Sequence, residues 1–102
     1  MNTIIKKIKQ QIKYNFIIIY MKGSPKSKMC LFSDKSLNYL IYSGINFKYV
    51  NILENNDIYL ELPIFSKWPT FPQIWINNKL IGGFDIIYDL YKNGNLKKIL
   101  KK

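Results

Sequence analysis

The stretch Lys22-Gly-Ser-Pro-Lys-Ser-Lys-Met-Cys-Leu-Phe-Ser33 joins a run of apolar residues to a helical pattern and contains the only cysteine, Cys30. A lone cysteine is most often a small buried apolar residue. Here Gly23, Ser24 and Pro25 predict a loop, and loops between rigid elements commonly carry function. A helix N-terminus and neighbouring lysines lower a cysteine pKa and favour the reactive thiolate. Cys30 is therefore the first candidate functional residue.

The apolar run before this loop, Phe16-Ile-Ile-Ile-Tyr-Met21, is short and continuous. It is typical of a central strand that is covered on both faces. Upstream of it, isoleucines at helical spacing predict an amphipathic helix from Thr3 to Lys13. Downstream of the loop, the apolar spacing predicts a helix from Cys30 or Leu31 to Ser43, and Gly44 stands where a helix C-terminus favours a left-handed residue.

The second half of the chain predicts strands at 47–51, 73–77 and 80–81, and helices at 57–65, 86–91 and 95–102. A helix separates the first two strands of the chain, so we expect a right-handed parallel crossover between them. Asn77-Asn-Lys79 predicts a hairpin turn, and Asp85 stands at or near the N-cap of the next helix. This order predicts a three-layer α/β domain of thioredoxin type, with a mixed four-stranded sheet flanked by helices.

Length and charge limit the functional classes. A chain of 102 residues is expected to form one domain, 1–102. Its formal net charge of +10 allows an anionic partner, but every basic residue is lysine, and arginine is preferred for bidentate base and phosphate contacts. One cysteine forms no internal disulfide, and the longest apolar run is too short to span a bilayer. We expect a cytoplasmic protein without a nucleic-acid or membrane partner.

Three segments, 22–33, 68–72 and 82–85, fall at junctions between predicted elements, where α/β sheets commonly bind ligands. In the predicted topology they converge. The first supplies a lysine and a thiol, the second a backbone edge beside a proline, and the third a glycine-rich turn with a carboxylate. Such a site suits a small peptide that carries a carboxylate, an amine and a thiol.

Four motifs carry a resemblance over nearly the whole chain: Tyr-Met-Lys-Gly-Ser-Pro-Lys at 20–26, Cys-Leu-Phe-Ser at 30–33, Trp-Pro-Thr-Phe-Pro-Gln at 68–73 and Gly-Gly-Phe-Asp at 82–85. On these motifs the chain resembles the monothiol glutaredoxins, in particular the short single-domain bacterial type. The resemblance implies the thioredoxin-like glutaredoxin fold, glutathione as ligand and a homodimer bridged by a [2Fe-2S] cluster. It also implies cluster delivery or storage for iron–sulfur client proteins, and pairing with BolA-type proteins.

The resemblance also implies roles for single residues. Cys30 is the cluster ligand and the catalytic thiol of any redox reaction, and Lys22 binds the glycyl carboxylate of glutathione. The backbone of Phe71 pairs with the cysteinyl part of glutathione, and Pro72 after it is cis. The γ-glutamyl end is assigned to the last motif, with Gly83, Phe84 and Asp85. For Asp85, capping the following helix is an equally good explanation.

The sequence departs from the family pattern at three positions. Leu31 replaces the glycine of the Cys-Gly-Phe-Ser signature. Tyr59, still counted as a glutathione-binding position, stands where the family usually has an arginine that also binds the glycyl carboxylate. A hydroxyl cannot replace a bidentate guanidinium, so we expect weaker glutathione binding, with Lys22 carrying more of it. Phe84 replaces a cysteine that the bacterial type often has, which leaves Cys30 without a second thiol.

Three functions remain open on the sequence. The leading one is a cluster carrier with at most weak oxidoreductase activity. Four sulfur-type ligands are needed for the cluster, so one cysteine per chain requires two chains and two glutathiones. The second is a glutathione-dependent thiol oxidoreductase, in which Cys30 removes glutathione from a mixed disulfide; Ser33 replaces a resolving cysteine, so only this monothiol route is available. The third is a thioredoxin-fold module that binds a partner without glutathione.

Overall fold

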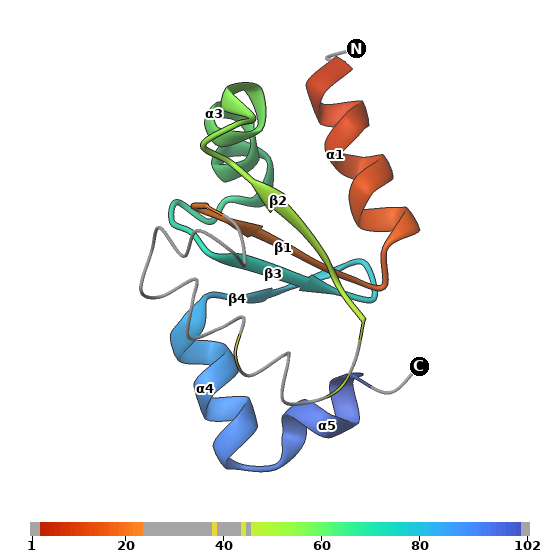
Figure 1. Ribbon diagram of the computed structural model, residues 1–102, viewed down its shortest axis with the longest axis vertical. Helices are drawn as coiled ribbons and strands as arrows, with labels where there is room; N and C mark the ends of the chain where they lie inside the picture. Colours follow the sequence, from red (N-terminus) through yellow and green to blue (C-terminus); the bar gives the residue numbers. More distant parts are fainter. Residues whose placement is uncertain (1–2, 24–37, 39–43, 45, 101–102) are drawn as a thin grey trace.

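A computed structural model describes residues 3–23, 38, 44 and 46–100 (Figure 1). The elements are α1 (Thr3–Tyr14), β1 (Ile17–Met21), β2 (Lys48–Asn51), α3 (Asn56–Ser66), β3 (Gln73–Ile76), β4 (Lys79–Gly82), α4 (Phe84–Lys92) and α5 (Asn95–Leu100). They match the predicted elements to within a few residues. The helix predicted from Cys30 or Leu31 to Ser43 lies outside the described residues, apart from Asn38, which is helical.

The four strands form one mixed sheet in the order β2-β1-β3-β4. Strands β1 and β2 are parallel, which confirms the predicted parallel pairing, and β3 is antiparallel to both β1 and β4. Every residue of β1 and of β3 is buried. The two central strands are therefore covered on both faces, as the continuous apolar run in β1 predicts.

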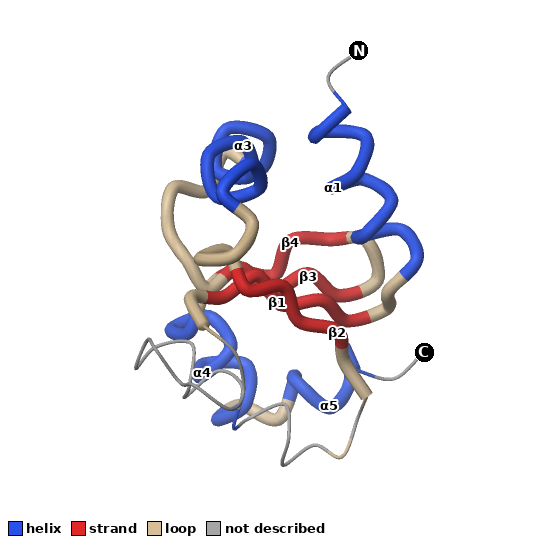
Figure 2. Tube along the Cα trace, turned by 45° about the horizontal axis from the view of Figure 1, so that its top comes forward, coloured by secondary structure: helices blue, strands red, loops and turns tan. Residues whose placement is uncertain are grey.

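Helices cover both faces of the sheet: α1 and α3 lie on one side, and α4 and α5 lie on the other (Figures 1 and 2). Successive side chains of a strand point to opposite faces. Accordingly, Ile17, Ile19 and Met21 belong to the core beneath α4 and α5, whereas Ile18 and Tyr20 belong to the core beneath α1 and α3. The predicted three-layer architecture of thioredoxin type is confirmed. Within the described residues, no helix is long and apolar enough to cross a membrane.

The turns follow local backbone rules, with one correction at α4. Asn77 and Asn78 have φ values of 52° and 67°, as a tight hairpin turn requires. Gly82 has a φ of 140°, and a Cβ atom there would lie 2.8 Å from Cγ1 of Ile86, so only glycine fits between β4 and α4. The N-cap of α4 is Gly83 rather than Asp85. Asp85 stands inside the first turn, where its carboxylate faces the positive end of the helix dipole.

Tyr20 carries the principal buried hydroxyl of the central strands. Its side chain is fully buried, and its hydroxyl donates a hydrogen bond of 2.9 Å to Oε1 of Gln11 in α1. Burial raises the pKa of this hydroxyl, because the charged form loses its hydration. The bond ties α1 to β1.

We expect folding stability to fall as the pH rises above about 10, because tyrosine ionises there in the unfolded chain but Tyr20 stays protonated in the fold. Tyr20→Phe should remove this component and cost roughly 0.5–1.5 kcal/mol at neutral pH, the net value of one hydrogen bond. Denaturant unfolding at neutral pH and at about pH 11 measures both effects. Tyr14→Phe is the control, because Tyr14 is 74% exposed. The same pH dependence in wild type and Tyr20→Phe would contradict this assignment.

Candidate functional site

The described parts of the three segments predicted to converge, namely 22–23, 68–72 and 82–85, lie at one end of the sheet. Because β1 and β3 are antiparallel, the end of β1 lies beside the start of β3, and Tyr20 pairs with Gln73. The end of β4 lies on the other side of β3, where Gly82 pairs with Ile74. Three predicted site residues directly adjoin these strand ends: Lys22, Pro72 and Gly83.

Lys22 is partly exposed and directly follows β1. Its position is fixed by the next residue: Gly23 is buried, has a φ of 95° and donates its N–H to Oδ1 of Asn51 at 2.8 Å. The same oxygen accepts the N–H of Leu53 at 3.0 Å. Asn51, at the end of β2, thus holds the chain where it leaves β1. Asn51 was not predicted as a site residue, although a polar residue ending a strand parallel to β1 is a recognisable signal.

Phe71, Pro72 and Tyr59 form the second part of the site. The Phe71–Pro72 bond is cis, as the resemblance implies, and Pro72 is buried. The Phe71 and Tyr59 ring centroids lie 5.9 Å apart, and Tyr59 is 39% exposed. Position 59 therefore borders the loop that carries Phe71.

The N-terminus of α4 forms the third part. The carbonyl oxygen of Pro72 lies 3.4 Å from the place that a Cβ on Gly83 would occupy, and Oδ1 of Asp85 lies 3.7 Å from the same place. The N-cap Gly83 makes no side-chain capping hydrogen bond, and the N–H groups in the first turn of a helix can bind an anion. Asp85 is exposed beside them. Phe84 begins the helix, but its side chain is not among the described parts.

A buried glutamine holds the loop between α3 and β3. Gln73 is fully buried; its Nε2 donates to Oγ of Ser66 at 2.9 Å and to the carbonyl oxygen of Trp68 at 2.8 Å. Its Oε1 accepts from Nε1 of Trp75 at 3.2 Å. This network fixes the segment that presents Phe71 and Pro72. Gln73 was predicted only as part of a strand, although a polar residue in a buried strand needs such partners.

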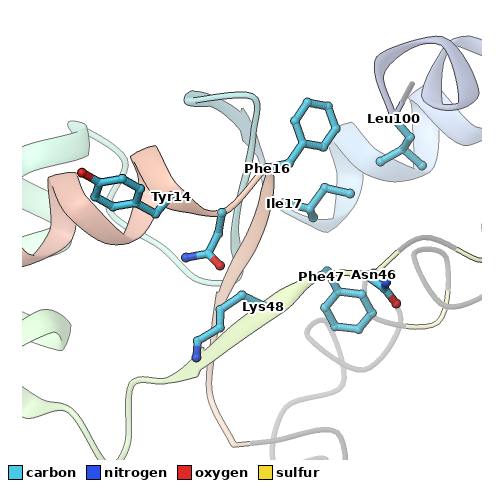
Figure 3. A pocket seen from close by; sticks show the side chains of 8 residues that line it. Tyr14, Phe16, Ile17, Asn46, Phe47, Lys48 and Leu100 are labelled. Atoms are coloured by element: carbon cyan, nitrogen blue, oxygen red, sulfur yellow. The ribbon is translucent and has the colours of Figure 1, made fainter. Parts of the chain in front are cut away.

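Cys30 lies outside the described residues, as do Leu31 and Ser33. Within the described residues, no three His, Cys, Asp or Glu side chains gather as a metal site. Two open hollows are lined by described residues, and the second of them reaches Asn51 beside the end of β1. The first, about 490 Å³, is at the opposite end of β1, between Tyr14, Phe47 and Leu100 (Figure 3). The second, about 460 Å³, follows β2. None of the predicted site residues lines either hollow.

Comparison with known proteins agrees with the resemblance read from the motifs. Residues 17–81 match the family described as Glutaredoxin. The chain belongs to the glutaredoxin family. Glutaredoxin 4 of Buchnera aphidicola subsp. Acyrthosiphon pisum (strain APS) is 52% identical over 100 residues, which are 98% of this chain and 93% of that protein. Glutaredoxin 4 of Escherichia coli K12 is 47% identical over 102 residues, 100% and 89% of the two chains.

Solved structures agree on the fold of this glutaredoxin. The crystal structure of a buckwheat glutaredoxin–glutathione complex superposes with a TM-score of 0.85 and covers 96% of this chain and 87% of that one. The two sequences are 19% identical, so the superposition supports the fold alone. The predicted glutaredoxin fold is confirmed, and the single cysteine makes this glutaredoxin a monothiol member.

We expect Gln73→Leu to lower the free energy of unfolding of this glutaredoxin by about 1–3 kcal/mol, because the buried N–H of Trp75 loses its partner and half-buried oxygens of Ser66 and Trp68 each lose one hydrogen bond. Denaturant titration measures the change. Gln10→Leu is the matched control, because Gln10 is exposed on α1, and it should stay within about 0.5 kcal/mol of wild type. Equal stabilities of the two variants would show that the network does not fix the loop.

Proposed function

We propose that this glutaredoxin binds glutathione at the strand-end site, and that Cys30 and glutathione together hold a [2Fe-2S] cluster between two chains for transfer to client proteins. One observation carries the proposal: Lys22, the Phe71–Pro72 segment and the Gly83–Asp85 turn, far apart in the sequence, adjoin one another at one end of the sheet. The cationic side chain of Lys22, the backbone beside Pro72 and the carboxylate of Asp85 suit a short peptide with charged ends.

Along its length, glutathione carries groups that complement the three parts of the site. The ammonium of Lys22 complements the glycyl carboxylate, and the backbone of Phe71 offers a peptide edge to the cysteinyl residue. The N–H groups at the start of α4 complement the γ-glutamyl carboxylate, and Asp85 beside them complements its ammonium group. A net charge of +10 also attracts this anionic tripeptide. The buckwheat glutaredoxin, which shares the fold, was crystallised as a glutathione complex.

The cluster is cargo that the chain cannot hold alone. A [2Fe-2S] cluster takes four sulfur-type ligands, and the chain has one cysteine. Within the described residues, no other group of side chains offers a metal site. Thiolates from a second chain and from two glutathiones complete the set, so the cluster itself joins the two subunits.

We expect Lys22→Ala to weaken glutathione binding roughly ten- to a hundredfold, because a charge-assisted hydrogen bond is worth about 1.5–3 kcal/mol and the Tyr59 hydroxyl cannot form the bidentate contact of an arginine. Isothermal titration calorimetry measures the affinity. Lys79→Ala is the control: it removes the same charge at the start of β4, the end away from the site. A Lys22→Ala affinity within a factor of two of wild type, or an equal loss in both variants, would refute the role of Lys22.

The second test concerns Cys30 and the oligomeric state. Anaerobic reconstitution with iron, sulfide and glutathione should convert a colourless monomer into a coloured dimer, and omission of glutathione should prevent this because two chains offer only two thiolates. Cys30→Ser should remain folded by circular dichroism but colourless and monomeric. Light scattering with absorbance recorded on the same peak measures both properties.

Two outcomes would contradict the carrier function. A stable dimer of Cys30→Ser would show that a protein interface, rather than a cluster, joins the chains. A colourless wild-type protein that rapidly reduces a small glutathione mixed disulfide would favour the oxidoreductase.

A further inference from the structure

Helix α3 has apolar side chains on both its inner and its outer side. Ile58 and Leu62 face the core and are buried. On the opposite side, Leu60 is 58% exposed and Ile64 is 73% exposed. These two residues are four positions apart and therefore neighbours on the helix surface; we call them the outer stripe of α3. A surface helix normally presents polar side chains to water. Exposed apolar side chains at neighbouring positions instead indicate a surface that a partner could cover and shield from water.

Carboxylates flank the outer stripe in a chain that is otherwise strongly basic. Three of the six acidic residues fall within this short region, Glu54, Asp57 and Glu61, and no lysine occurs between Lys48 and Lys67. Asp57 forms an ion pair of 3.6 Å with Lys7 of α1. Within the described ranges, Glu54 and Glu61 make no ion pair. Helix α3 itself therefore carries two carboxylates and no ammonium group, while Lys7 offsets Asp57 and Lys67 directly follows the helix.

The outer stripe also adjoins the candidate site. Helix α3 lies on the same side of the sheet as α1 (Figures 1 and 2). Tyr59, next to Leu60 in the helix, packs its ring against Phe71 at 5.9 Å between centroids. A partner seated on the outer stripe would thus lie beside the strand-end site.

We propose that the outer stripe of α3 docks a basic amphipathic helix of another protein. The apolar side chains call for an apolar ridge on the partner, and Glu61, three positions before Ile64, calls for an arginine or lysine beside that ridge. A second copy of this chain fits less well, because each copy carries a net charge of +10 and identical faces would oppose their carboxylates. The lysine-rich helix α1 of a second copy is not available as the basic partner helix, because its apolar side is already buried, with Ile8 and Ile12 in the core.

Two designed helical peptides test the proposal, both with the same leucine ridge, one flanked by arginines and the other by glutamates. The overall charge of the protein favours the glutamate peptide, whereas the local charge of α3 favours the arginine peptide. Titration into the full-length, isotope-labelled protein, followed by amide chemical shifts, separates the two. We expect saturable shifts at α3 with the arginine peptide only.

Variants then locate the contact. Ile64→Lys and Glu61→Lys should each weaken binding of the arginine peptide about tenfold or more, without altering glutathione affinity. Matched controls lie on α4, on the opposite face of the sheet: Tyr91→Lys, at a residue 52% exposed, and Asp89→Lys should leave peptide binding unchanged.

Three outcomes would overturn the proposal: no saturable binding of the arginine peptide, preference of α3 for the glutamate peptide, or equal weakening by the α4 controls. Light scattering of the protein alone tests whether a second copy of the chain occupies the outer stripe. Self-association that Ile64→Lys abolishes would assign the outer stripe to a second copy of the chain instead.

Discussion

The antiparallel pairing of β1 with β3 is the constraint on which the rest of the molecule depends. Both strands are buried on both faces, so a shift of register by one residue would exchange the two cores and is strongly disfavoured. The register that pairs Tyr20 with Gln73 also determines which loops adjoin. It brings the chain leaving β1 beside the chain entering β3, and so assembles the candidate site from segments that share no local sequence signal.

The side-chain amides of Asn51 and Gln73 then fix the positions of these loops more closely. Asn51 holds the backbone at Gly23, and Gln73 holds the loop from Ser66 to Trp68. Each amide bonds to backbone groups that have no strand or helix partner. The site is thus positioned by polar residues that need not contact the ligand, which is how a rigid scaffold supports functional loops.

Much of the architecture follows from local rules that the sequence displays. The apolar run before Lys22 indicates a buried central strand, Asn77-Asn78 indicates a tight turn, and helical spacing indicates α1 and α4. Asp85 was predicted at or near the N-cap of α4; it lies in the first turn, and Gly83 takes the N-cap position through its extended backbone. Asn51 was missed because its partner Gly23 is distant in the sequence, and Gln73 was missed because its partners depend on how the loop before β3 folds back. Hydrophobic periodicity carries no information on such hydrogen bonds.

The order of the strands has a consequence for behaviour at high concentration. Ile17–Met21 is uncharged, β-branched and proline-free, the kind of segment that forms intermolecular sheets when exposed. In the fold it lies between β2 and β3. The strands at the two open edges, β2 and β4, each begin with an exposed lysine, Lys48 and Lys79. A lysine on an edge strand opposes pairing with a strand of another molecule. The lysines on both edge strands therefore help to keep Ile17–Met21 from forming intermolecular sheets.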